Sequence, residues 1–156
     1  MRKRIIEPKR NSLTPDQPWL NLESLAQVEV SSEEAQHPIE AALVPGAAPG
    51  WRAAAPGQQI VRLMFDEPQN LRLIHLVFDE HEEERLQEYT LRWCSGAGQP
   101  YREIVRQQYN FSPPTSSREV EDFNVNLDSC AELELSIIPD LKGSAAHASI
   151  AELRLA

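Results

Sequence analysis

The chain has 156 residues, of which 41% are hydrophobic and 25% are charged, and its formal net charge at pH 7 is −9. These values predict one soluble globular domain with a substantial core. The net negative charge argues against a broad phosphate-binding face, which needs clustered Lys and Arg, so we expect no nucleic-acid partner.

The first 23 residues are predicted to form an N-terminal tail ending in a docking segment, ahead of a β-sandwich binding domain at 24–156. Residues 1–10 carry five basic side chains and one acidic side chain, which gives +4 and leaves −13 for the rest. Three prolines in the tail exclude a continuous helix or central strand. We expect a solvated tail, with contact to an anionic partner as the alternative, anchored by Trp19, Leu20 and Leu22.

No stretch approaches the roughly 20 apolar residues that a membrane-spanning helix needs. The basic start is interrupted at once by Glu7, Pro8 and Lys9. We therefore expect no membrane span, no signal peptide and a cytoplasmic location. The two cysteines, Cys94 and Cys130, do not make a disulfide framework, and free thiols are expected.

The predicted strands begin at 26–31. Residues 32–57 are less regular, with a short apolar segment at 39–44 and then a long loop at 45–57 that is rich in Pro and Gly. Long loops within compact domains are often functional. This loop is therefore the first candidate for a binding element.

The centre of the pattern is a pair of apolar runs, 60–65 and 71–78, on either side of a turn signal at 66–70. This pattern predicts two buried strands in a hairpin-like arrangement. A tight turn is predicted at 128–129, and one helical turn or a wide loop at 80–87. Further strands are predicted at 88–95, 101–111, 118–127, 130–138 and 147–155. Strands and turns at this spacing are typical of β-sandwiches and barrels.

Antiparallel strands would place the connections alternately at the two ends of the sandwich. One end receives short turns, at 66–69, 96–100 and 128–129. The other end receives longer loops, at 45–57, 80–87, 112–117 and 139–146. Because function on rigid β-scaffolds concentrates on clustered loops, the long-loop end is the predicted binding surface.

Four residues at this end are the candidate ligand-binding residues: Trp51, Arg52, Arg85 and His147. An exposed Trp51 could stack on a sugar ring or an apolar group, and Arg52 could hydrogen-bond hydroxyl groups or carboxylates. The alternative is that Trp51 folds back over the end of the core and is buried there.

Motifs for catalysis and for zinc are absent from the sequence. The run 79–84 carries five carboxylates in six positions, but contiguous carboxylates cannot all converge on one ion. We expect this run to be a solvated loop, with a site for a basic partner as the alternative. The four histidines are scattered without metal-ligand spacing, and no nucleophile-elbow motif occurs. We therefore expect no enzyme and no cofactor.

The order of these features resembles the discoidin, or coagulation factor 5/8 type C, group of galactose-binding-like β-sandwiches. The matching elements are a V-x-V-S-S strand at 28–32, a P-I-E-A-A-L segment at 38–43, a loop holding Trp51, and the strand at 57–65. The resemblance covers about residues 24–156. It implies an eight-stranded antiparallel jelly roll that binds rather than catalyses. Many relatives carry a structural calcium, for which no ligands can be matched in this chain.

These observations predict a non-enzymatic binding module, with carbohydrate as the first ligand class, bound through loops at one end of the sandwich. The alternative is a protein-interaction or assembly module without a small-molecule ligand, which would use a sheet face or the acidic loop. The sequence leaves the oligomeric state open.

Overall fold

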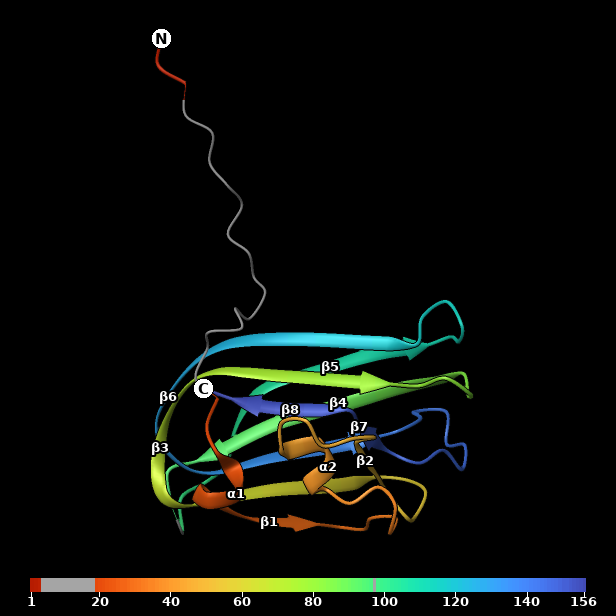
Figure 1. Ribbon diagram of the computed structural model, residues 1–156, viewed down its shortest axis with the longest axis horizontal. Helices are drawn as coiled ribbons and strands as arrows, with labels where there is room; N and C mark the ends of the chain where they lie inside the picture. The colour runs from red at the N-terminus through yellow and green to blue at the C-terminus, as the bar shows by residue number, and fades with distance from the viewer. Residues whose placement is uncertain (4–18, 97) are drawn as a thin grey trace.

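The computed structural model describes residues 1–3, 19–96 and 98–156, and its regular structure is almost entirely β-strand (Figure 1). Two short helices, α1 (Leu22–Leu25) and α2 (Glu40–Leu43), lie near the start of the chain. The strands are β1 (Ala26–Val30), β2 (Trp51–Arg52), β3 (Gln59–Asp79), β4 (Arg85–Cys94), β5 (Arg102–Phe111), β6 (Arg118–Ile138), β7 (Ser149–Ile150) and β8 (Glu152–Leu155). The predicted antiparallel all-β sandwich is confirmed, while the finer description as an eight-stranded jelly roll stays a prediction.

Two strands of 21 residues each, β3 and β6, form the spine of the sandwich. They pair antiparallel with each other, and both fold over at the same end of the molecule, on the left in Figure 1. One layer has the strand order β1–β3–β6–β4–β5, and the second is built from β8 with the other halves of β3 and β6. A separate small sheet pairs β2 with β7. One sheet therefore folds over itself to enclose the core.

The bend in the two long strands lies where the sequence predicted two separate turns. The ladder between β3 and β6 shifts register here, as at a β-bulge. Pro68 falls in this interruption, where its missing N–H costs no ladder bond. On the partner strand Ser129 has a φ of +57°, and its N–H donates to Asn70 Oδ1 at 2.9 Å. The predicted hairpin turn at 66–70 and tight turn at 128–129 are therefore wrong.

The core is filled by alternate side chains from both layers, as the period-2 pattern predicted. In the first layer Val61 lies opposite Leu135 and Leu63 opposite Leu133, and all four are buried. The second layer contributes buried residues from β3 and β8: Ile74, Leu76, Phe78, Leu153 and Leu155.

The strand predicted at 88–95 is β4, which begins earlier than expected, at Arg85.

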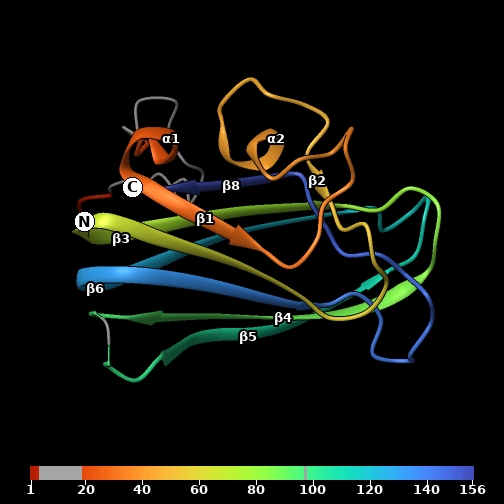
Figure 2. The ribbon, with the colours of Figure 1, turned by 90° about the horizontal axis from the view of Figure 1, so that it is seen from below.

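The helices α1 and α2 lie together at the edge of the sandwich where β1 and β8 are found (Figure 2). Leu22 of α1 and Leu43 of α2 belong to the core. The buried guanidinium of Arg154 in β8 donates from Nη1 to the carbonyl oxygen of Ala42 at 2.6 Å. The short apolar segment noted at 39–44 is thus a helix that covers this edge.

The predicted docking segment contacts the body through all three of its apolar residues. The backbone N–H of Leu20 donates to Leu155 O at 2.8 Å, Leu22 is in the core, and the Trp19 ring lies 5.9 Å from the ring of His75. The basic stretch of the predicted tail falls mostly on 4–18, outside the described residues.

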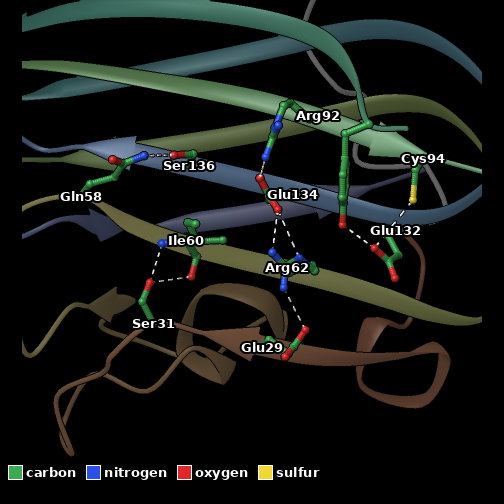
Figure 3. A network of polar contacts seen from close by, with 11 residues as sticks. Glu29, Ser31, Gln58, Ile60, Arg62, Arg92, Cys94, Glu132, Glu134 and Ser136 are labelled. Carbon is green, nitrogen blue, oxygen red and sulfur yellow. Dashed lines mark hydrogen bonds and ion pairs between the residues drawn. The ribbon is translucent and has the colours of Figure 1, made fainter. Parts of the chain in front are cut away.

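The outer face of the first layer carries a network of ion pairs (Figure 3). Its centre is Glu134 on β6, which accepts hydrogen bonds from Arg62 on β3 and from Arg92 on β4. Nearby, the Cys94 thiol lies 3.7 Å from a carboxylate oxygen of Glu132. Cys94 and Cys130 are both free and buried, in agreement with the predicted thiols.

The connections divide between the two ends of the sandwich as the alternation of strands predicted. The turn between β4 and β5 lies at the bent end, and the longer loops lie at the other, on the right in Figure 1. This second end is called the loop end below. Within the described ranges, no helix is long and apolar enough to cross a membrane.

Candidate functional site

A pocket of about 360 Å³ opens at the loop end. It is lined by His37, Pro49, Trp51, Arg52, Asp79, Glu80, His81, Glu82, His147, Ser149, Ile150 and Ala151. These residues come from β2 and the loop before it, from the end of β3 and the loop after it, and from the segment around β7. The three segments lie far apart in the sequence. The pocket brings together three of the four predicted site residues.

One wall of the pocket is the two-stranded sheet formed by β2 and β7. Trp51 pairs with Ile150 and Arg52 with Ser149. Gly50 makes this close approach possible, because a Cβ at this position would lie 2.7 Å from Ile150 O, and its φ of +100° is unfavourable for other residues. Ser32 fixes the following loop, since its hydroxyl accepts hydrogen bonds from the backbone N–H groups of Ala54 and Ala55.

Trp51 is buried in the core, with 1% of its surface exposed. Its indole Nε1–H donates to Ser32 O at 3.0 Å. The indole therefore closes the end of the core and forms the floor of the pocket. The prediction that Trp51 stacks on a ligand is not supported by this geometry, and the alternative, a Trp folded back onto the core, is the observed one.

Arg52 lies beside Trp51, and 43% of its side chain is exposed. Its Nε lies 3.1 Å from Glu34 Oε1, while its backbone is held by His37 O and by the N–H of Glu34. This ion pair orients the guanidinium and leaves further N–H groups facing solvent, since a guanidinium has five donors. Arg52 is therefore placed to donate hydrogen bonds to a ligand in the pocket.

His147 is half-buried on the pocket wall, and its Nδ1 lies 2.8 Å from Ala53 O. A carbonyl oxygen only accepts hydrogen bonds, so Nδ1 carries the proton. In the neutral imidazole Nε2 is then an acceptor. His147 thereby offers an acceptor for a ligand hydroxyl group in the same pocket as the donors of Arg52.

Arg85 is buried and does not line the pocket, so the structure does not bring it together with the other three predicted site residues. Its Nε donates to Glu80 Oε1 at 2.7 Å, and its Nη1 donates to Gln87 and to Pro139 O. The other Glu80 oxygen accepts from the backbone of Glu82 at 3.1 Å. Burial opposes ionisation of Glu80, but these bonds outweigh it and lower its pKa. Arg85 therefore positions the acidic loop.

Sequence reasoning missed several residues of the pocket. Asp79 is the last residue of β3 and lines the pocket, and within the described residues its carboxylate contacts only Arg118, at 3.4 Å. Ser149 contributes a hydroxyl, and His37 and His81 contribute imidazoles. The acidic run 79–84 and the clustering of loops at one end pointed to Asp79 and His81. For Ser149 and His37 only the clustering of loops did, because the pairing of β2 with β7 leaves no periodic signal in such short strands.

Among the described residues, no group of three or more His, Cys, Asp or Glu side chains is arranged to hold a metal ion. The carboxylates present thus do not fit a calcium site built from side chains. In the pocket, the three histidines and three carboxylates are spread over its walls. The arrangement offers hydrogen-bond donors and acceptors over a packed Trp floor, which is chemistry suited to binding.

Solved structures with the same fold are distant in sequence. A Clostridium perfringens family 32 carbohydrate-binding module in complex with GalNAc-β-1,3-galactose has a TM-score of 0.64 and 14% identity, over 88% of this chain and 99% of that chain. The family 32 module of C. perfringens NanJ, in complex with galactose, has a TM-score of 0.62 and 16% identity, over 88% and 96%. Reduced XRCC1, bound to the catalytic domain of DNA polymerase β, has a TM-score of 0.61 and 15% identity, over 89% and 98%.

No family model and no curated protein sequence matches the chain. The structural likeness shows the fold, which is the discoidin-like, galactose-binding type of β-sandwich. The resemblance read from the sequence motifs is therefore confirmed at the level of the fold. The motif V-x-V-S-S now has a structural meaning: Ser31 and Ser32 hydrogen-bond Ile60 and Gln59, which fixes the start of β3.

Proposed function

We propose that the chain is a non-enzymatic carbohydrate-binding module whose ligand occupies the loop-end pocket. The observation that carries this proposal is the pocket itself: at about 360 Å³ it lies within the 300–1,000 Å³ range typical of small-molecule sites. Its polar groups converge from three segments above an apolar floor. The sugars named in the structures of the family 32 modules support the same ligand class.

Three side chains carry the proposed binding. Arg52 donates to ring or exocyclic oxygens, His147 accepts from a hydroxyl through Nε2, and Asp79 accepts through its weakly paired carboxylate. Each of these bonds replaces one that the sugar makes with water, so net gains per bond are modest, about 0.5–1.5 kcal/mol. Weak binding to a monosaccharide is therefore expected, strengthened by additional sugar units.

The test is isothermal titration of the purified chain with galactose, N-acetylgalactosamine and longer glycans. Arg52→Ala and His147→Ala are expected to weaken binding at least fivefold without changing the fold. Arg106→Ala is the matched control, because Arg106 is an exposed arginine on β5, in an ion pair with Glu103 and outside the pocket. Failure of every glycan to bind would refute the proposal.

A second candidate is a protein-interaction module. The similarity to XRCC1, solved bound to a polymerase domain, favours this candidate, as does the exposed acidic segment after β3. It predicts association with a basic peptide, or a mass in light scattering that rises with concentration. A monomer at all concentrations that does not bind polylysine would rule it out.

A further inference from the structure

The charges around the loop-end pocket are unbalanced. Three carboxylates line it, from Asp79, Glu80 and Glu82, whereas Arg52 is its only lining Lys or Arg among the residues that the structure describes. The positive charge of Arg52 is already paired with Glu34. The lining thus has little positive charge left to offer an anionic ligand.

The three lining carboxylates differ in how well they are neutralised. Glu80 is held by the buried Arg85 at 2.7 Å and contributes little free charge. In the part of the chain that the structure describes, Asp79 is paired only at 3.4 Å with Arg118, whose side chain is 56% exposed, so solvent weakens this pair. Glu82 is exposed on the acidic loop, beside Glu83. The uncompensated negative charge is therefore that of Asp79 and Glu82.

We propose that the pocket selects a sugar bearing an ammonium group, a hexosamine, over a sugar bearing a carboxylate. This inference rests on the proposed function and names its ligand class. Opposite charges attract and like charges repel inside a concave site, where low-dielectric walls focus the field. A uronic acid would meet Asp79 and Glu82 with only Arg52 to oppose them. A hexosamine places its cation against those carboxylates while its hydroxyl groups bind Arg52 and His147.

The experiment compares four sugars that share one ring: galactosamine, galactose, N-acetylgalactosamine and galacturonic acid. Titrations at pH 7 and low salt are expected to rank galactosamine first and galacturonic acid last, with the neutral sugars between them. For one unit charge at close range, we expect galactosamine to bind about fivefold or more tightly than galactose, and galacturonic acid about fivefold or more weakly than galactose. Ethanolamine, an ammonium compound without a ring, is expected not to compete.

Two variants locate the selectivity. Asp79→Asn and Glu82→Gln are each expected to lower the preference for galactosamine over galactose at least threefold. Glu82→Gln, which removes none of the three side chains proposed to bind the sugar hydroxyl groups, should leave the affinity for galactose within twofold. Glu23→Gln is the matched control, because it removes one exposed carboxylate on α1, outside the pocket. High salt should narrow the preference in the parent chain.

Three results would overturn the inference while sparing the proposed function. The first is galacturonic acid binding as tightly as galactosamine, and the second is an unchanged preference in the two pocket variants. Competition by ethanolamine as strong as that by galactosamine would also contradict it, since the sugar ring would then be irrelevant. If none of the four sugars binds, the proposed function itself fails, and the inference with it.

Discussion

The carboxylate of Glu134 accepts two hydrogen bonds from Arg62 on the neighbouring strand, from Nε at 3.2 Å and from Nη2 at 2.9 Å (Figure 3). Arg92 approaches the same carboxylate from β4, so one anion is shared by two cations. Glu134 is 1% exposed. Burial opposes its ionisation, but the bonds from Arg92 and Arg62 outweigh burial and lower its pKa. This pairing joins β3, β6 and β4 across the outer face.

We predict that Glu134→Ala lowers the free energy of unfolding by about 3 kcal/mol, because it leaves two guanidinium groups without their shared partner. Urea unfolding at pH 7 measures this loss. The stabilisation by Glu134 is present above the pKa of the unfolded carboxyl group and is lost as pH falls through the lower folded pKa. Glu103→Ala, which removes an exposed partner of Arg106, should lower the free energy of unfolding much less, because solvent screens this pair. Equal losses would contradict the prediction.

The buried carboxyl group of Glu119 on β6 predicts that stability depends on pH in the opposite sense to the dependence expected for Glu134. Glu119 is 2% exposed, and neither of its carboxylate oxygens has a hydrogen-bond partner in the described part of the chain. Burial is the larger cause, and the charge of Glu121 the smaller cause, that raise the pKa of Glu119 to about 7. Tyr89 and Arg85 lower this pKa, but by less. Folding therefore favours protonated Glu119, so the folded chain loses stability as pH rises from about 4.5 to about 7.

We predict that Glu119→Gln removes this loss. The variant should match the parent chain near pH 4 and exceed it at pH 8 by up to roughly 3 kcal/mol, at about 1.36 kcal/mol for each pKa unit. Urea unfolding from pH 4 to pH 8 measures the difference. Glu121→Gln is a useful comparison, because Glu121 already accepts a hydrogen bond from Gln107 and should gain less. A difference that does not vary with pH would refute a buried titration.

Most of the fold could be predicted from the alternation of apolar residues, because each half of β3 and β6 buries one face. The two turn signals misled the prediction for one shared reason. Residues 66–70 and 128–129 lie opposite each other in the folded sheet, where Gln69 pairs with Cys130 and Arg72 bonds Asp128 at 2.7 Å. Turn-forming residues on both strands mark one bend. Distinguishing a bend from two hairpins requires the pairing, which the sequence does not display.

The site was only partly predictable. The alternation of connections placed the long loops at one end, and that end holds the pocket with Arg52 and His147. Trp51 and Arg85 are predicted as ligand-binding residues from their positions in the long loops at 45–57 and 80–87. Both instead find partners inside the protein: Ser32 O for Trp51, and Glu80 with Pro139 O for Arg85. Ser32 lies 19 residues from Trp51 and Pro139 lies 54 residues from Arg85, so local pattern could not reveal these two partners.

The buried position of Trp51 predicts separate effects on stability and on binding. Trp51→Phe should lower the free energy of unfolding by about 1–3 kcal/mol, through lost packing and an unpaired Ser32 O. Sugar affinity should change less than threefold, because the floor of the pocket stays apolar. Urea unfolding and titration with the best glycan measure the two quantities. Lost binding with unchanged stability would instead mean that the indole contacts the ligand.

Gly50 is the position where the pocket wall is most sensitive to a single methyl group. A Cβ there would meet Ile150 O at 2.7 Å and Ala151 Cα at 3.1 Å, and both are backbone atoms that cannot rotate away. Gly57 has a similar φ, +85° against +100°, but its added Cβ would have nothing within 4 Å. Alanine substitutions at the two glycines therefore separate two costs. One is the cost of placing a non-glycine residue in a left-handed backbone conformation, and the other is the cost of the steric contact with Ile150 and Ala151.

We predict that Gly57→Ala lowers the free energy of unfolding by about 1–2 kcal/mol, the usual cost of a non-glycine residue in this conformation. Gly50→Ala should cost at least about 2 kcal/mol more, because β2 must also move away from β7. Since β2 and β7 form the pocket wall, Gly50→Ala should weaken sugar binding and Gly57→Ala should not. Urea unfolding and titration test both statements. Similar stability losses in the two variants would mean that β2 and β7 are not packed as closely as this structure shows.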